Sequence, residues 1–226
     1  MVTRYRDLRP IQWGTDVAGV RTRLPVTGRM AALTFDACGS LLGKGYDGKL
    51  IDFLRRSSVP ATLFLNARWI DANPDTAADL AADPLFEIGN HGTLHLPLSV
   101  SGRSAYGIAG TRSVEEVFDE VDGSLPMLAD LTGKPPVLFR SGTAHYDEIG
   151  TRIVGDLGMR AIGFDVNGDG GATFTANQVQ QAMCEVRPGS IVIAHLNHPG
   201  SGTAEGMIKA IPELVAKGFR FVHIND

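Results

Sequence analysis

The sequence contains little that would connect the protein to a membrane, to nucleic acid or to a disulfide-stabilised scaffold. Its apolar runs are all far shorter than the ~20 residues that cross a bilayer. The net charge is −4 and no basic stripe is present, which argues against nucleic acid or an anionic membrane as a partner. The chain has only two cysteines, Cys38 and Cys184, and no Cys-x-x-Cys motif, so we do not expect a disulfide framework or a bond between the two.

Several signatures of other protein classes are also missing. The first ten residues, MVTRYRDLRP, lack the apolar middle region of a secretory signal, although a chain with a trimmed leader would look the same. The stretch CGSLLGKG at 38–45 has a glycine spacing one residue too short for a phosphate-binding loop, and no Gly-x-Ser-x-Gly motif occurs. Aromatic residues make up only 7%, which argues against a long stacking platform and favours a short ligand or a polymer end.

Apolar segments alternate with helical segments along the rest of the chain. The apolar segments are short, rich in β-branched residues and mostly continuous, as in strands covered on both faces. They are residues 30–35, 61–65, 86–89, 137–139, 160–164, 190–194 and 219–224. The helices expected between them are 46–56, 74–82, 113–131 with a kink or break at Pro126, 147–157, 176–186 and 204–217. This order predicts parallel βαβ units and an α/β fold.

Polar side chains stand at or just after the C-terminal ends of several predicted strands. They are Asp36, Asn66, Asn90, His91, Arg140, Asp165 and His195. A barrel brings many strand ends to one rim, whereas an open sheet concentrates its ligand at one switch point, so we favour a barrel. No linker or internal repeat divides the chain. We expect an N-terminal extension at 1–29 that packs on a barrel formed by 30–226.

One segment, GNHGTLH at 89–95, has the spacing of a metal-binding pair. His91 and His95 are four residues apart, and on one helical turn both imidazoles would face the same way. The alternative is a pair of capping or core histidines. The position directly after a strand favours metal binding.

Three further rim segments each have a structural and a functional interpretation. His195 in VIAHLNH is either a structural histidine at a loop start or a general acid or base. Arg140 in FRSGTAHYDE either fastens the barrel rim or keeps a catalytic carboxylate ionised. The stretch FDVNGDGG at 164–171 is either a turn or the source of a carboxylate that orients a histidine.

Singly these signals are weak, but their order along the chain is informative. The series strand–Asp, strand–His-x3-His, strand–Arg, strand–Asp, strand–His resembles the polysaccharide deacetylases, also called family 4 carbohydrate esterases, from about residue 30 to the C-terminus. LTFDACG at 33–39 is similar to the family's first motif, usually Thr-Phe-Asp-Asp. NHGTLH is similar to the second, FRSGTAHY to the third, FDVNGDGG to the fourth and IVIAHLNH to the last. The third and fourth matches are loose.

The resemblance implies a distorted (β/α)7 barrel, similar to a TIM barrel, that removes acetyl groups from N-acetylated or O-acetylated carbohydrate. Asp36 would be the general base that activates a metal-bound water. His91 and His95 would be ligands of a divalent metal, with Zn2+ favoured and Co2+ or Ni2+ as alternatives. His195 would be the general acid, and Arg140 would orient Asp36.

The resemblance also implies roles for the surroundings of these groups. Asp169, or failing that Asp165, would hold His195. The backbone N–H of Tyr146 would contribute to the oxyanion site, and Leu196 and Asn197 would lie against the substrate.

The main departure from the family pattern is Ala37, which stands where the family usually has an aspartate as third metal ligand. Three explanations stay open. Asp36 ligates the metal itself, or His145 or His198 completes the site, or the metal is bound weakly and the protein is a degraded relative that binds sugar. We expect Cys38 to point elsewhere, as a small buried packing residue.

Three functions are therefore carried forward. The first is a metal-dependent deacetylase acting on carbohydrate that contains N-acetylglucosamine. The second is a non-catalytic carbohydrate-binding relative, and the third is an amidohydrolase acting on a cyclic imide or ureide. We expect a periplasmic or secreted protein by resemblance alone, with the cytoplasm left open, and a mobile rim loop at 99–110. The oligomeric state cannot be read from the sequence.

Overall fold

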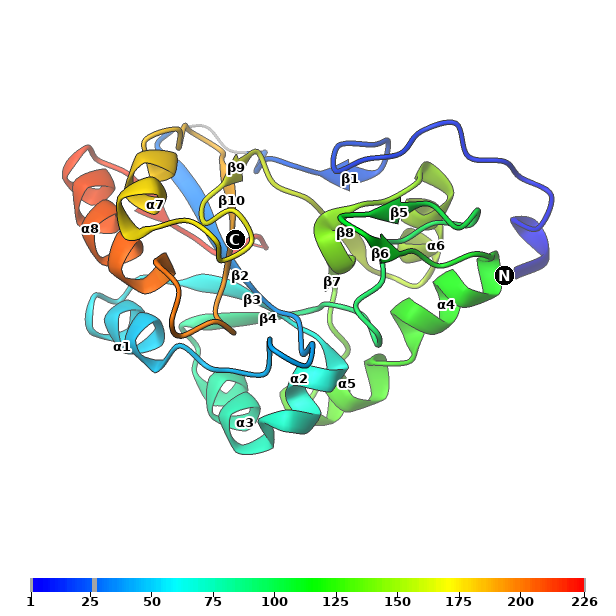
Figure 1. Ribbon diagram of the computed structural model, residues 1–226, viewed down its shortest axis with the longest axis horizontal. Helices are drawn as coiled ribbons and strands as arrows, with labels where there is room; N and C mark the ends of the chain where they lie inside the picture. Colours follow the sequence, from blue (N-terminus) through cyan, green and yellow to red (C-terminus); the bar gives the residue numbers. More distant parts are fainter. Residues whose placement is uncertain (1, 26–27, 226) are drawn as a thin grey trace.

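A mostly parallel sheet that curls into an incomplete barrel organises the chain in the computed structural model, which describes residues 2–25 and 28–225 (Figure 1). The strand order is β1 (Val20–Arg21), β8 (Arg160–Ile162), β7 (Leu138–Phe139), β4 (Phe86–Asn90), β3 (Ala61–Leu65), β2 (Met30–Ala37), β10 (Ile191–His195) and β9 (Val166–Asn167). A further strand, β11 (Arg220–Phe221), pairs with the start of β2. The predicted α/β barrel-like fold is confirmed, and all seven predicted strands are present.

The helices lie between the strands, as the βαβ pattern predicts. They are α1 (Gly48–Arg56), α2 (Ala67–Ala72), α3 (Pro74–Ala82), α4 (Val114–Asp122), α5 (Leu125–Thr132), α6 (Glu148–Asp156), α7 (Ala176–Met183) and α8 (Thr203–Ala216). The expected helix at 113–131 is two helices, because the chain breaks at Gly123 and Ser124 and Pro126 lies in the first turn of α5. The short helix α2 was not predicted. No described helix is long and apolar enough to cross a membrane.

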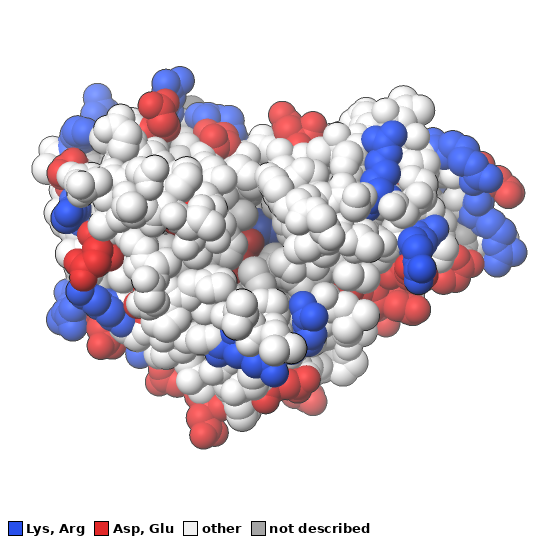
Figure 2. All heavy atoms as spheres, viewed as in Figure 1, with Lys and Arg blue, Asp and Glu red and all other residues white. Residues whose placement is uncertain are grey.

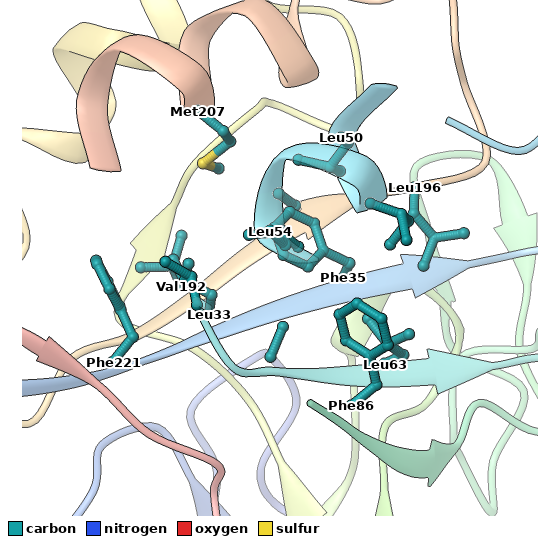
Figure 3. Close-up of a cluster of buried hydrophobic side chains, with 14 of the residues drawn as sticks. Leu33, Phe35, Leu50, Leu54, Leu63, Phe86, Val192, Leu196, Met207 and Phe221 are labelled. Atoms are coloured by element: carbon teal, nitrogen blue, oxygen red, sulfur yellow. The ribbon is translucent and has the colours of Figure 1, made fainter. Parts of the chain in front are cut away.

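The side chains of β2 alternate between two buried layers. Leu33, Phe35 and Ala37 belong to the hydrophobic cluster formed with α1, α7 and α8 (Figure 3). Ala32 belongs to a second cluster, with Phe64 and other residues of the barrel interior. Since side chains alternate along a strand, Asp36 shares the inner face with Ala32 and reaches the C-terminal mouth of the barrel.

Part of the expected N-terminal extension is a strand of the sheet. Val20 and Arg21 pair with β8, and Arg23 forms a bridge with Ser190 just before β10. This segment therefore lies between the two ends of the curled sheet. Tyr5 is buried in a hydrophobic cluster with residues of α4 and α6, and its hydroxyl donates to Asp156 Oδ2 at 2.7 Å.

The segment 99–110, expected to be a mobile loop, is largely a hydrogen-bonded hairpin. Strands β5 (Ser104–Ala105) and β6 (Ile108–Ala109) are antiparallel, and Ser99 N–H donates to Thr111 Oγ1 at its base. The turn residues Tyr106 and Gly107 have φ values of 51° and 76°, as a two-residue type I′ turn requires. A bulky residue seldom adopts a positive φ, so the hairpin holds the backbone of Tyr106 in an unfavourable conformation.

We expect Tyr5→Ala to lower the free energy of unfolding by about 3 kcal/mol, because it removes a buried aromatic side chain from a packed cluster. Urea unfolding at neutral pH measures the loss. The neighbouring Arg6→Ala removes only an exposed ion pair with Glu115, at 3.7 Å, and should change stability by less than about 0.5 kcal/mol. Equal and small effects of both substitutions would show that the N-terminal segment is not part of the core.

Candidate active site and metal centre

A buried ion pair between Asp36 and Arg140 crosses the interior of the barrel. Arg140 Nη1 donates to Asp36 Oδ1 at 2.8 Å and to Thr34 Oγ1 at 2.7 Å, and Nη2 donates to the Gly163 carbonyl at 2.9 Å. The guanidinium stacks over the Phe64 ring, 4.3 Å from its centroid. Arg140 is fully buried and Asp36 is 2% exposed, so the charges have almost no water to screen them.

These surroundings keep Asp36 ionised. Burial raises the pKa of its carboxyl, but the charge of Arg140, with smaller contributions from His91 and His195, lowers the pKa below its usual value. Oδ1 is occupied by Arg140, whereas Oδ2 lies 3.6 Å from His91 Nε2. The carboxylate is therefore held by one oxygen and can act through the other.

The two histidines come together on a loop, not on the helical turn that we expected. Gly92 and His95 have φ values of 78° and 62°, and the segment after β4 contains no helix. Buried Glu120 from α4 closes this loop, since its carboxylate accepts the N–H groups of Leu94 and Leu96 at 2.9 and 3.1 Å. A Cβ at position 92 would lie 2.2 Å from Glu120 Oε1, which explains the glycine. The rings of His91 and His95 pack edge to face, with centroids 4.8 Å apart.

Cys38 joins these histidines, which corrects our expectation that it points elsewhere. The ligand atoms of Cys38, His91 and His95 all lie within 4.8 Å of one another, the one cluster of this size in the described part of the chain that suits a metal. The alternation of β2 continues past its end, so Cys38 shares the inner face with Asp36, whereas Ala37 faces the helices. This period of two was the signal that could have identified Cys38 from the sequence. Cys184, by contrast, is a free and exposed cysteine.

Other candidates for the third ligand lie outside this cluster. His145 Nδ1 contacts the Thr143 carbonyl at 2.8 Å, and its ring packs against Trp13 and Tyr106. His198 lies in the loop between β10 and α8, and its carbonyl accepts the Ser201 N–H. The metal-sized cluster includes neither of these histidines, nor does it include Asp36.

His195 is oriented by Asp169, the first of the two acids that we considered. His195 Nδ1 lies 3.0 Å from Asp169 Oδ1, and the His195 backbone N–H donates to Oδ2 at 2.7 Å. Burial lowers the pKa of this imidazole, but the charge and hydrogen bond of Asp169 raise it well above the usual value. Asp165 instead accepts from Ser190 Oγ and the Ile191 N–H, and so anchors the start of β10.

Three residues expected at the substrate lie elsewhere. The Tyr146 N–H donates to the Gly14 carbonyl at 2.9 Å, so it is not free for an oxyanion. Its fully buried hydroxyl lies 2.9 Å from the Ser141 N–H and 3.0 Å from the Ile162 carbonyl, contacts that the loose third motif did not reveal. Leu196 is buried in the helix-side cluster, and Asn197 donates to the Gly43 carbonyl. Tyr146, Leu196 and Asn197 do not line the cavity described next.

A cavity of about 410 Å³ opens at this end of the barrel. Its lining includes four ionisable residues, Asp36, Cys38, His95 and His195. The lining also includes Tyr106 from the hairpin turn, with Ile108, Thr143, Phe164 and Asn167. The face shown in Figure 2 is hollowed near its centre, while charged side chains of both signs lie mostly towards its edge. The cavity therefore combines a few ionisable groups with an otherwise neutral lining.

Comparison with known proteins shows the family of the chain. A sequence model of the polysaccharide deacetylases matches residues 23–162, more than half of the chain. The chain belongs to the polysaccharide deacetylase family. One curated relative is the peptidoglycan N-acetylmuramic acid deacetylase PdaA of Bacillus subtilis, with 24% identity over 86% of this chain and 69% of that protein.

Solved structures of family 4 carbohydrate esterases share the fold of this chain. A peptidoglycan N-acetylglucosamine deacetylase aligns with a TM-score of 0.76 and 22% identity, covering 91% of this chain and 90% of that one. A pseudoenzyme from Bacillus anthracis aligns with a TM-score of 0.73 and 25% identity, covering 87% of this chain and 64% of that one. A mutant of that pseudoenzyme has restored enzymatic activity. The family thus includes both active and inactive barrels, and this chain spans less than two thirds of the pseudoenzyme.

We expect Arg140→Leu to lower the free energy of unfolding by about 3–5 kcal/mol at pH 7, because it leaves the Asp36 carboxylate buried without a partner. In the natural protein the pair stabilises the fold above the unfolded pKa of about 3.9, and this stability is lost as pH falls through the lower folded pKa of Asp36. In the variant the pKa of Asp36 rises, so protonation relieves the penalty. Urea unfolding at pH 7 and pH 5 should show the deficit shrinking at the lower pH.

The double variant Asp36→Asn/Arg140→Leu should recover part of the lost stability at pH 7, since no unpaired charge remains. A deficit below about 1 kcal/mol in the single variant, or one independent of pH, would contradict the importance of this ion pair.

Proposed function

We propose that the protein is a metal-dependent deacetylase that hydrolyses acetyl groups on carbohydrate. The observation that carries this proposal is the pairing of Asp36 and His195 across adjacent parallel strands, at the mouth that also holds the Cys38–His91–His95 cluster. The two side chains sit in register on β2 and β10 and both line the cavity. The proposed anionic base, Asp36, and the proposed cationic acid, His195, thus line the same cavity.

The residues of the cluster suit a divalent metal with nitrogen and sulfur ligands. When bound there, the metal would polarise the acetyl carbonyl and lower the pKa of its water. His91 Nδ1 is 2.8 Å from the Arg140 carbonyl, a contact that orients the ring and leaves Nε2 for ligation. Asp36, ionised and fixed through Oδ1, then accepts the proton of the attacking water at Oδ2.

His195 is placed to complete the reaction. Its Nδ1 is bound to Asp169, so Nε2 is the nitrogen that can give a proton to the departing amine or alcohol. The raised pKa of this imidazole keeps the donor form populated at neutral pH. Asp36 and His195 therefore divide the base and acid roles between two neighbouring strands.

The substrate we propose is an acetylated sugar of the cell wall, and the site of action is outside the cytoplasm. Support comes from PdaA and the N-acetylglucosamine deacetylase, whose names specify peptidoglycan. Tyr106 adds support, because it is 81% exposed and forms part of the cavity wall. An aromatic ring with a polar tip suits contact with a sugar, which has both apolar and hydroxyl faces.

A second function, non-catalytic carbohydrate binding, has one observation in its favour. Ala37 stands where the family usually has a ligand, and one structural relative is a pseudoenzyme. The cyclic imide or ureide alternative has no comparable support from the cavity or the comparisons. Metal content and acetate release separate the first two functions.

We expect the purified protein, loaded with Zn2+ or Co2+, to release acetate from chitin oligomers or peptidoglycan, and Asp36→Asn to reduce kcat by roughly 10²–10⁴-fold through loss of the general base. Acetate assay and metal analysis provide the measurements. The control Asp165→Asn changes a carboxylate outside the cavity and should keep kcat within a few fold. Sugar binding without acetate release from any acetylated substrate would favour the second function.

We also expect the pH profile to depend on Asp169. The pKa of His195 is raised, so the imidazole is protonated below that pKa and loses its proton as pH rises through it. We expect kcat to fall over the same pH range, because the general acid is then lost. Asp169→Asn removes the charge that raises the pKa, and should move the alkaline limb to lower pH by roughly one to three units. The control Asp165→Asn should leave the alkaline limb where it is. If Asp169→Asn also left the limb unchanged, His195 would not be the titrating acid.

A further inference from the structure

We propose that Cys38 is the third protein ligand of the metal, in place of the aspartate that the motif resemblance implies at the position of Ala37. This inference rests on the metal-dependent function proposed above and extends it to the identity of the ligand. The resulting site has two histidines and one cysteine. It differs from the set of two histidines and one aspartate that the resemblance implies, because a sulfur atom takes the place of a carboxylate oxygen.

The distances suit this assignment. Cys38 Sγ lies 3.8 Å from His91 Nε2, and the ligand atoms of the three residues are within 4.8 Å of one another. Ligand bonds to zinc of about 2.3 Å for sulfur and about 2.0 Å for nitrogen, at a tetrahedral angle, would place these two atoms about 3.5 Å apart. A shift of a few tenths of an ångström would therefore bring this pair to coordination distance.

The backbone explains why the ligand is at 38 and not at 37. Asp36 and Cys38 project from one face of the chain, whereas Ala37 is fully buried in the helix-side cluster beside β3. Ala37 has no ligand atom, and its methyl group packs there against apolar side chains. The side chain that reaches the metal from this end of β2 is Cys38.

The substitution also conserves charge. A thiolate with two neutral imidazoles has the same net charge as a carboxylate with two neutral imidazoles, so the formal charge of the metal site would be unchanged. Three protein ligands and one open position are typical of catalytic zinc, and Cys and His both serve in such sites. Sulfur is the softer donor and favours Zn2+ and Co2+ over Mg2+ or Mn2+.

Cobalt spectroscopy tests the proposal directly. Addition of one equivalent of Co2+ to the full metal-free chain should produce near-ultraviolet absorption from thiolate-to-cobalt charge transfer. Cys38→Ser should abolish this absorption and weaken Co2+ binding by more than about 100-fold, since loss even of an outer partner costs about 10–100-fold. The control Cys184→Ser changes the exposed cysteine and should leave both the absorption and the affinity unchanged.

A second measurement uses the natural chain, so its result does not depend on whether the Cys38→Ser variant folds. In the natural chain, Zn2+ should slow alkylation of Cys38 by iodoacetamide at least tenfold, as located by peptide mass spectrometry. Cys184 provides the internal control, because its alkylation should proceed equally with and without the metal.

The outcomes separate this inference from the proposed function. Stoichiometric metal binding and acetate release with no charge-transfer absorption and no protection of Cys38 would overturn the ligand assignment and leave the deacetylase intact. Failure to bind either metal would overturn both. Charge-transfer absorption that is lost in Cys38→Ser, without acetate release from any substrate, would support the ligand and overturn the deacetylase.

Discussion

The site depends on one buried cation, the guanidinium of Arg140. It holds Asp36 Oδ1 with one nitrogen and the carbonyls of Ile162 and Gly163, at the end of β8, with the other two, while its own carbonyl contacts His91 Nδ1. One residue therefore keeps the candidate base ionised and orients a candidate metal ligand. Because burying a lone charge is so unfavourable, the packing of the barrel interior depends on the same ion pair that holds the site.

Much of the architecture was predictable from local sequence. Continuous apolar strands, helical segments between them and polar residues at the strand ends together indicated a parallel barrel, and the order of the motifs indicated the family. The place of Asp36 and His195 on one mouth follows from the same pattern, since parallel strands carry their C-terminal residues to one edge. These features depend on periodicity and on chain order, both of which a sequence displays directly.

The remaining features depend on contacts between distant parts of the chain. The loop of His91 and His95 takes its shape from hydrogen bonds to Glu120. The backbone N–H of Tyr146 is already bonded to the carbonyl of Gly14, which is distant in sequence. Val20 and Arg21 form a strand of only two residues, one of them charged, which no apolar pattern marks, yet they extend the sheet beside β8. Cys38 was misjudged for a local reason, because strand alternation was not continued past Ala37.

Asp169 shows why a complete set of motifs is weak evidence of turnover in this family. Besides His195, its carboxylate accepts the hydroxyl of Thr203 at 2.9 Å and the N–H of Gly171 at 3.1 Å, so it ties α8 and a loop to β10. Selection for a folded barrel would preserve this acid in a lineage that no longer turned over any substrate. Loss of function in such barrels should therefore first become visible at side chains that face the cavity and support little else, as that of Cys38 does in this chain.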